Sequence, residues 1–292
     1  MGETIAALLG IAQDGGVPQA GCIKSCCMTE FGGPTRHRNP VALGLSAEDG
    51  SRHLFEASRT LSEQLRIWAN ADGGPLNRID SLWITHAHLG HIDGLGQFGC
   101  EAWGPKEIPI HASESMIQLI YDSPNLAHLF TNGHLVPTPF KDGKKVQLSP
   151  ELSITPIRVP HRDELTDTYA FLIKTESARL LFLPDHDSWE ETLSLHSQED
   201  PMSWFRSLFV DIALLDATFW SGDELEGHAR DIGHPVVEET LDLLGRRGPS
   251  DPRVILFHFN HTNPLHDEAS GEVAKVRAMG WEIGRQGMHF HL

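Results

Sequence analysis

The feature that most constrains the fold of this chain is an apolar segment, residues 79–85, that ends directly in a cluster of histidines. The segment has the length of a buried β-strand, and His86, His88 and His91 follow it within six residues. A turn that leaves a strand can direct His86 and His88 toward one point, because the sheet fixes the backbone, and imidazole suits zinc or iron. A chance polar loop is the alternative, but other histidines also follow apolar segments. We therefore expect a metal site at this edge of a sheet.

Charge and hydropathy narrow the classes of partner. The 292 residues include 40 Asp and Glu against 23 Lys and Arg, a formal charge of -17. Because a general nucleic-acid binder needs a basic face to neutralise phosphates, we expect no nucleic-acid partner. No apolar run approaches the ~20 residues that cross a bilayer, and the amino-terminal segment lacks the basic start of a signal peptide. We therefore expect no membrane association and a cytoplasmic location.

Short apolar strands alternate with amphipathic helices along the chain. No repeat, low-complexity tract or long polar linker interrupts them, so we expect a single domain over residues 1–292. Strands that arrive in groups with helices between them indicate an α/β (α+β) fold, a four-layer αββα sandwich of two mixed β-sheets packed face to face under outer helices. The expected strands are residues 4–11, 41–45, 52–55, 79–85, 108–111, 152–159, 168–174, 179–183, 211–215, 253–257 and two short closing strands, and the expected helices are 61–69, 113–121, 188–196, 235–244 and 267–279.

Local signals predict where two of these helices begin. Ser113 is expected to cap the helix of residues 113–121, because its hydroxyl can accept a hydrogen bond from a free backbone N–H. Pro235 is expected at the first position of the helix of residues 235–244, with Glu238 and Glu239 near the positive helix end.

The histidine cluster and three later strand ends together resemble a known set of motifs. Residues 86–91 resemble the HxHxDH signature of the metallo-β-lactamase superfamily, and His161, Asp185 and His258 match its later ligands in the same order. The resemblance implies the metallo-β-lactamase fold and two adjoining metal sites. One site would use His86, His88 and His161, the other His91 and His258, and Asp185 would be shared.

One motif position departs from the superfamily. Gly90 stands where HxHxDH has its aspartate, and glycine cannot bind a metal. The loss of a carboxylate weakens the second site, so the chain either holds one catalytic metal or recruits Asp93 or Asp187 as a substitute. The alternatives are that Asp93 is a polar loop residue and that Asp187 caps a helix.

The glycine variant of the motif narrows the resemblance to the coenzyme PQQ synthesis protein B branch. His261 departs from that branch, which usually has asparagine there, and the run Asp185-His186-Asp187 is closer to ordinary hydrolases of the superfamily. The resemblance therefore implies a paralogue-like relative. The matching segments are residues 10–16, 18–19, 86–91, 159–162, 216–220, 222–224, 233–235 and 260–264.

The resemblance also implies two catalytic residues beside the metals. His234 occupies the position of the proton donor in the superfamily's nucleases and phosphodiesterases, where it would protonate a leaving oxygen. The alternative is a surface residue at the start of a helix. Asp216 would orient a neighbouring ligand from outside the coordination sphere. Arg162 pairs either with an anionic group of the substrate or with its neighbours Asp163 and Glu164.

Three of the four cysteines lie close together, at Cys22, Cys26 and Cys27. Adjacent cysteines seldom form a disulfide without strain. In related phosphodiesterases of the phosphonate pathway, three clustered cysteines and a histidine hold a structural zinc, and that histidine follows the last catalytic ligand by three residues. His261 has this spacing from His258. The resemblance thus implies a structural Zn²⁺ at Cys22, Cys26, Cys27 and His261, with buried free thiols as the alternative. Cys100 is expected in the core.

The function that follows is a metal-dependent hydrolase that uses a metal-bound hydroxide on a small ester or phosphodiester. It would hold one or two catalytic Zn²⁺ ions, with Fe²⁺ as the alternative metal, in addition to the structural Zn²⁺. One alternative is a non-haem iron oxygenase in pyrroloquinoline quinone biosynthesis, acting on a tyrosine-containing peptide. Another is a non-catalytic carrier with a degraded metal site, which Gly90 favours. We expect a small-molecule or short-peptide substrate and take a homodimer as the default assembly. The histidines expected to serve only packing or the surface are His111, His134, His186, His196 and His228.

Overall fold

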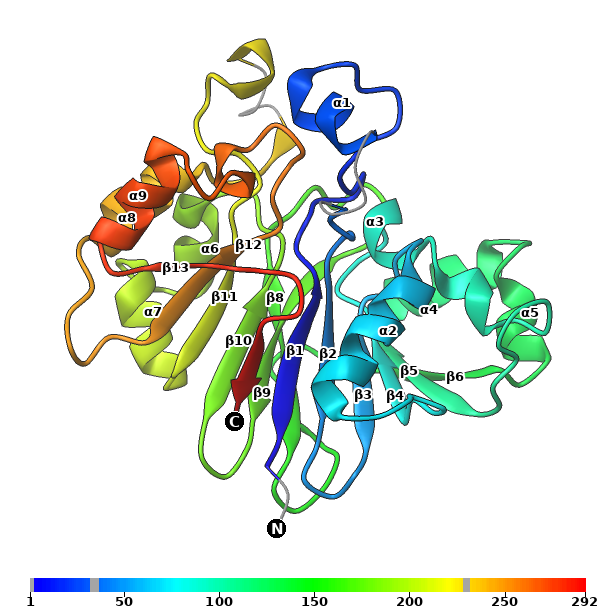
Figure 1. Ribbon diagram of the computed structural model, residues 1–292. Coiled ribbons are helices and arrows are strands. Elements are labelled where there is room, and N and C mark those ends of the chain that lie inside the picture. Colours follow the sequence, from blue (N-terminus) through cyan, green and yellow to red (C-terminus); the bar gives the residue numbers. More distant parts are fainter. Residues whose placement is uncertain (1–2, 32–36, 228–231) are drawn as a thin grey trace.

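Two mixed β-sheets form the centre of the molecule (Figure 1). The computed structural model describes residues 3–31, 37–227 and 232–292, and within them each sheet has seven strands. The strand orders are β14-β1-β2-β3-β4-β5-β6 and β13-β12-β11-β10-β9-β8-β7. The mixed sheets predicted from the sequence are therefore confirmed.

Each sheet combines an antiparallel part with a parallel part. In the first sheet β14, β1, β2 and β3 pair antiparallel, whereas β3 to β6 pair parallel. In the second sheet β7 to β10 pair antiparallel, and β10 to β13 pair parallel. The first sheet consists of β1 (Ile5–Gly10), β2 (Ala42–Ser46), β3 (Arg52–Phe55), β4 (Ser81–Trp83), β5 (Ile108–Ala112), β6 (Leu135–Pro139) and β14 (His289–His291). The second consists of β7 (Val146–Gln147), β8 (Ser153–Val159), β9 (Thr168–Lys174), β10 (Arg179–Leu183), β11 (Ile212–Asp216), β12 (Arg253–Phe257) and β13 (Glu282–Ile283).

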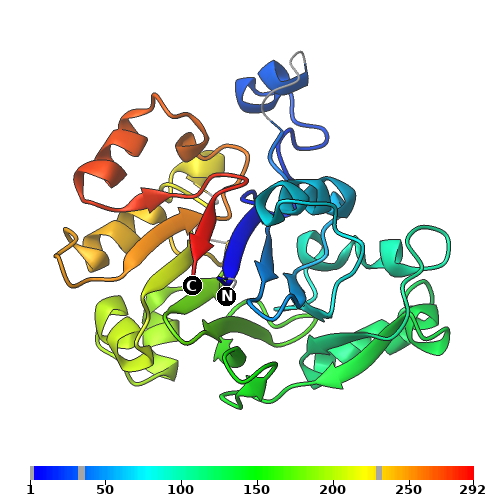
Figure 2. The same ribbon diagram turned by 60° about the horizontal axis from the view of Figure 1, so that its bottom comes forward.

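Helices cover the outer faces of both sheets, which gives the predicted αββα layers (Figures 1 and 2). Helices α2, α4 and α5 lie outside the first sheet, and α6 to α9 lie outside the second. The short helices α1 and α3 lie at the edge that is uppermost in Figure 1. The helices are α1 (Ser25–Phe31), α2 (Leu61–Asp72), α3 (Leu89–Ile92), α4 (Glu114–Asp122), α5 (Ala127–Thr131), α6 (Trp189–Leu195), α7 (Pro201–Leu208), α8 (Val237–Leu244) and α9 (Gly271–Ala278).

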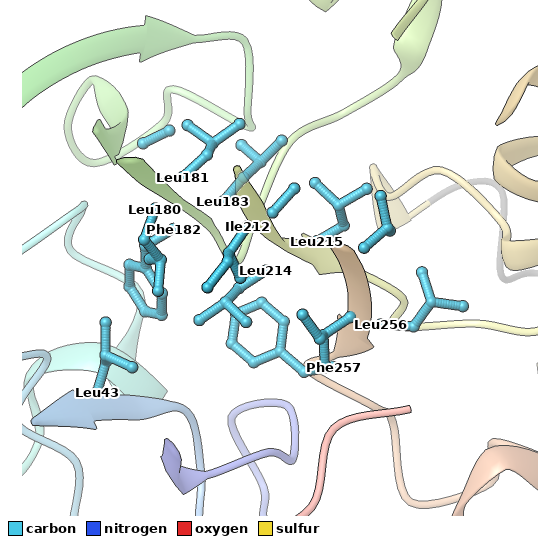
Figure 3. Close-up of a cluster of buried hydrophobic side chains, with 14 of the residues drawn as sticks. Leu43, Leu180, Leu181, Phe182, Leu183, Ile212, Leu214, Leu215, Leu256 and Phe257 are labelled. Carbon is cyan, nitrogen blue, oxygen red and sulfur yellow. The ribbon is translucent and has the colours of Figure 1, made fainter. Parts of the chain in front are cut away.

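Large apolar side chains fill the space between the two sheets (Figure 3). The Phe182 ring lies 5.9 Å from that of Phe55 in the first sheet and 5.6 Å from that of Phe257, in tilted arrangements that aromatic pairs favour. Leu43 of β2 belongs to the same fully buried cluster. The inner faces of both sheets are buried in this core. Because protein interiors are closely packed, the core holds the strand ends of the two sheets in fixed positions relative to each other.

The structure confirms one predicted helix start and corrects the other. Ser113 caps α4, and its Oγ accepts a hydrogen bond from Met116 N at 3.3 Å. Helix α8 begins at Val237 and not at Pro235. The reason is that Val236 is extended and pairs with Phe219 as an isolated β-bridge, so the helix cannot include it. Across the described ranges, none of the helices combines the length and hydropathy that a membrane span requires.

Candidate metal centre

The six side chains predicted to bind catalytic metals come together where the strands of the two sheets end. They reach this edge from both sheets because β4 belongs to the first sheet and β8, β10 and β12 to the second. All of them are buried except His88, which is partly exposed. The six are His86 and His88 after β4, His91 in α3, His161 after β8, Asp185 after β10 and His258 after β12.

His86, His88 and His161 form the first ligand set. One ring nitrogen of each lies within 4.8 Å of the others. His161 Nε2 is 3.3 Å from His88 Nδ1, and His86 Nε2 is buried without a hydrogen-bond partner. Two imidazole nitrogens on one tetrahedral zinc are about 3.3 Å apart. The set therefore fits a single metal ion.

His91 and His258 form a second set, which also includes Asp14. Asp185 lies between the two sets. Its Oδ1 is 3.5 Å from His161 Nε2, and its Oδ2 is 3.2 Å from His91 Nε2 and 3.7 Å from His258 Nε2. The Nε2 atoms of His91 and His258 and the Oδ2 of Asp185 are buried without hydrogen-bond partners. Because unpartnered buried polar atoms are rare in folded proteins, this concentration fits a second ion.

Each histidine of the two sets directs its second ring nitrogen at a side-chain oxygen. Such contacts fix the orientation of a metal-binding imidazole and raise its basicity. None of the five oxygens belongs to a residue that the sequence singled out for this role. The pairs are His86 Nδ1 and Thr85 Oγ1 at 2.8 Å, His88 Nε2 and Glu164 Oε1 at 3.3 Å, His91 Nδ1 and Glu56 Oε1 at 3.4 Å, His161 Nδ1 and Asp187 Oδ1 at 3.2 Å, and His258 Nδ1 and Thr218 Oγ1 at 2.9 Å.

Charge and burial set the protonation of the centre. Burial, with smaller contributions from neighbouring histidines, holds the pKa of His86 well below its ordinary value, so this ring is neutral. Burial alone would raise the pKa of Asp185, but His258 and His91 outweigh it and hold that pKa below its usual range. Neutral imidazole and ionised carboxylate are the forms that bind metals. These two side chains are therefore in the ligand form near neutral pH.

His234 and Asp216 form a buried pair beside the first set. His234 Nδ1 lies 2.7 Å from Asp216 Oδ2 and 3.9 Å from Asp185 Oδ1. The pKa of Asp216 lies well below its usual range, because the attraction of His234 outweighs the effect of burial. Asp216 also accepts hydrogen bonds from Thr218 Oγ1 at 2.7 Å and from His186 N at 3.3 Å. Asp216 is thus placed to orient His234, and its Oδ1, 3.8 Å from His258 Nδ1, also faces the His258 ring of the second ligand set.

Comparison with known protein families shows to which superfamily the chain belongs. The β-lactamase superfamily domain matches residues 51–259, a span that contains all six predicted ligands. The chain belongs to the metallo-β-lactamase superfamily.

Relatives within the superfamily agree with this architecture. Coenzyme PQQ synthesis protein B of Xanthomonas axonopodis pv. citri is 23% identical, over 98% of this chain and 99% of its own. The structure of Zn²⁺-bound PqqB from Methylobacterium extorquens matches with a TM-score of 0.77 at 21% identity, and covers 99% of this chain and 100% of its own. A diphosphatase from the PhnP family matches with a TM-score of 0.67 at 18% identity, and covers 100% of this chain and 98% of its own. The chain thus shares its fold with superfamily proteins described as a diphosphatase and as a PQQ synthesis protein.

Neither carboxylate suggested as a substitute for the missing motif aspartate lies in the second set. Asp93 forms an ion pair with Arg59, with 2.7 Å between Oδ2 and Nε. Asp187 contacts the outer nitrogen of His161 and accepts a hydrogen bond from the backbone N–H of Arg162 at 3.1 Å. Asp187 does not cap a helix either, because Ser188 caps α6.

Sequence reasoning missed two acidic residues beside the second ligand set, Asp14 and Glu56. Asp14 follows β1 and lies within residues 10–16, a segment that matches the PQQ synthesis branch, so a signal existed there. Glu56 follows β3 directly, just as the ligand residues follow their strands. Its carboxylate is fully buried, and burial raises its pKa.

Cys22, Cys26, Cys27 and His261 come together although His261 is far away in the sequence. The Sγ atoms of Cys22 and Cys26 are 3.8 Å apart, and those of Cys26 and Cys27 are 4.0 Å apart. His261 Nδ1 lies 3.4 Å from Cys26 Sγ and 3.5 Å from Cys27 Sγ. On a tetrahedral zinc, two sulfurs are about 3.8 Å apart and a sulfur and a nitrogen about 3.6 Å. The four side chains therefore fit one zinc ion.

The remaining histidines and the fourth cysteine are outside these sites. Cys100 is exposed, so the expectation that it lies in the core is wrong; it belongs to a turn beyond the short 3₁₀ helix of Leu95–Phe98. His228 lies outside the described residues. The packing residues are His111, stacked on Trp83 at 4.0 Å, His196, stacked on Trp204 at 4.9 Å, His186, which contacts Thr192 Oγ1 at 2.9 Å, and His134, which contacts the Pro105 carbonyl at 2.8 Å.

Proposed function

We propose that this protein is a metal-dependent hydrolase that cleaves a small ester or phosphodiester with two adjoining metal ions. The observation that carries the proposal is the position of Asp185. Its two oxygens face different ligand sets, with Oδ1 toward His161 and Oδ2 toward His91 and His258. A carboxylate between two nitrogen-rich sets is the arrangement with which two-metal hydrolases hold both ions close to one substrate oxygen.

In this centre some residues would bind the metal ions and others would orient the ligands. His86, His88 and His161 would hold one ion, His91 and His258 the other, and Asp185 both. Zinc ions held in this way lower the pKa of water toward ~7 and polarise a substrate oxygen. Thr85, Glu164, Glu56, Asp187 and Thr218 would keep the imidazoles in the ligand orientation.

His234 is proposed as the proton donor to the leaving oxygen. Asp216 holds its Nδ1 at 2.7 Å, which fixes the ring and leaves Nε2 as the nitrogen that can exchange a proton with a substrate. The ring lies next to the first set, with its centroid 5.0 Å from that of His161. A general acid in this position contributes typically about 10²–10⁴-fold to the rate.

The likeness to a diphosphatase supports a phosphorylated compound as the substrate class. Bound metal ions reverse the local charge where an anionic group must enter, although the formal charge of the chain is -17. The likeness to coenzyme PQQ synthesis protein B supports the alternative of an iron oxygenase acting on a peptide.

The test is a substrate panel on purified protein loaded separately with Zn²⁺, Mn²⁺ and Fe²⁺. Bis(p-nitrophenyl) phosphate and p-nitrophenyl acetate report diester and ester hydrolysis, and an oxygen electrode reports oxygen uptake with Fe²⁺ and a tyrosine-containing peptide. We expect metal-dependent hydrolysis that His161→Ala abolishes. Oxygen uptake without hydrolysis would support the oxygenase instead, and bound metal without either reaction would support the carrier.

A further inference from the structure

The second ligand set contains a carboxylate that no superfamily motif places there. Asp14 follows β1 and packs against α3, the helix that carries His91. Its Oδ1 lies 3.5 Å from His91 Nε2, and Asp14, His91 and His258 each offer one ligand atom within 4.8 Å of the others. A separation of 3.5 Å is long for a hydrogen bond but close to the ~3.4 Å expected between nitrogen and oxygen ligands of one zinc ion.

Gly90 explains why Asp14 can occupy this place. A Cβ added at Gly90 would lie 2.3 Å from Asp14 Oδ1 and 2.4 Å from Asp14 Cα. The second contact involves backbone, so a change of rotamer cannot relieve it. The φ of Gly90 is not positive, so its backbone conformation does not itself require glycine. Asp14 thus occupies the space in which a side chain at position 90 would begin.

The backbone around Asp14 is tied to the loop that carries His258. Gln13 N donates to Phe259 O at 2.9 Å, and Phe259 N donates to Ile11 O at 2.8 Å. A β-bridge between Ala12 and Phe259 completes this connection. The residues directly before Asp14 and directly after His258 are therefore paired, which holds the carboxylate and the imidazole at a fixed separation.

Two other observations favour Asp14 as a metal ligand over Asp14 as a simple ion-pair partner of His91. His91 Nδ1 faces Glu56 Oε1 at 3.4 Å, so a carboxyl group already lies beside His91 at the ring nitrogen that Asp14 does not face. The Nε2 atoms of His91 and His258 are both buried without hydrogen-bond partners on the side that Asp14 faces. A metal ion satisfies all three groups, whereas an ion pair between Asp14 and His91 leaves His258 Nε2 without a partner.

We propose that Asp14 supplies the carboxylate that position 90 lacks, so that Asp14, His91, Asp185 and His258 together form a complete second metal site. The site has two imidazole and two carboxylate ligands, a set that suits Zn²⁺ or Fe²⁺. The apparent loss of the motif aspartate is then a relocation of that carboxylate to another loop, and the two-metal centre is not degraded. The inference rests on the proposed function only in requiring catalytic metals.

The experiment counts metal ions in Asp14→Ala by elemental analysis and measures their affinities by calorimetry on stripped, reloaded protein. We expect three Zn²⁺ per chain in the wild type, including the one at the cysteine cluster, and two in Asp14→Ala. The affinity for the lost ion should fall at least 100-fold. Asp93→Ala is the matched control, because that carboxylate lies in the same region but pairs with Arg59, and it should retain all three ions. Gly90→Ala should also lose one ion, because its Cβ would displace Asp14.

The proposal is overturned if Asp14→Ala retains all three ions at unchanged affinity. It is also overturned if Asp93→Ala loses an ion as Asp14→Ala does. The zinc-loaded wild type provides a check that needs no variant: anomalous diffraction should place an ion within about 2.5 Å of an Asp14 carboxylate oxygen. An ion bound to His91 and His258 but not to Asp14 would overturn the proposal equally. If the wild type binds both catalytic ions as described but hydrolyses nothing, the proposed function fails while the assignment of Asp14 stands.

Discussion

The cysteine cluster offers the sharpest test of a single site, because one atom can be changed with little change in shape. In Cys27→Ser, the buried Sγ that lies 3.5 Å from His261 Nδ1 becomes a hydroxyl, which binds zinc poorly. Structural zinc contributes about 10–16 kcal/mol of binding free energy in small zinc peptides. Divided over four ligands, this is about 2.5–4 kcal/mol per ligand, or two to three orders of magnitude in affinity.

Loss of the zinc should affect α1 more than the rest of the fold. Helix α1 has seven residues, and isolated helices below ~12–15 residues are marginal in water. Of the described side chains in α1, only Cys27 is buried, so the helix has little other attachment. We expect amide exchange within α1 to accelerate at least tenfold in Cys27→Ser, whereas strands β1 and β12 should exchange as in the wild type.

The assay is elemental analysis after dialysis against a chelator, combined with hydrogen exchange read by mass spectrometry. The matched control is Cys100→Ser, because Cys100 is a free, exposed thiol outside the cluster. It should retain the same zinc content and α1 protection as the wild type. The reasoning is refuted if Cys27→Ser resists the chelator as well as the wild type does, or if α1 keeps its protection after the zinc has gone.

Three further predictions concern the catalytic centre and stability. Asp216→Asn, measured at saturating metal, should lower kcat at least tenfold and alter the pH profile, because it weakens the contact that orients His234; an unchanged profile would contradict this. Glu56→Gln should weaken metal binding at the His91 set by about 10–100-fold, which calorimetry would detect, and leave the other sites unaffected. Burial lowers the pKa of His53 to about 4. The unfolded chain, with a histidine pKa of ~6.5, therefore takes up this proton first as the pH falls, and the group withdraws up to about 2 kcal/mol of stability by pH 5. Denaturant melts of metal-stripped protein at pH 7 and pH 5 should show this loss, and His53→Gln should show less of it.

The layers and strand ends of this fold could be predicted from the sequence because its strands are short, apolar and bounded by polar residues. Strands β3, β9, β10 and β12 begin and end where the pattern predicted. Helix α3 was expected to be a turn, because four residues are too few to display a helical period. Helix α7 was not predicted, although Asp200 and Pro201 form a capping signal at its start.

The role of Asp14 could not be derived from local pattern. The contact that defines it joins residues far apart in the chain, and it depends on the pairing of the β1 loop with the residue after His258. Gly90 therefore suggested that a metal ligand had been lost. A sequence motif records which residue stands at position 90, but it does not record that the side chain of Asp14 occupies the same space. Glu56 and Thr218 were missed for a related reason, since their importance lies in the ring nitrogen that each one contacts.

The central claim, a two-metal hydrolytic centre, is tested most directly by titrating metal-stripped protein with Zn²⁺ while hydrolysis of bis(p-nitrophenyl) phosphate is followed. The account predicts that the cysteine cluster takes up one equivalent without activity and that hydrolysis reaches its maximum only when the third equivalent has bound. A protein that binds three equivalents and hydrolyses neither the diester nor p-nitrophenyl acetate, or one that is fully active with a single catalytic ion, would contradict it.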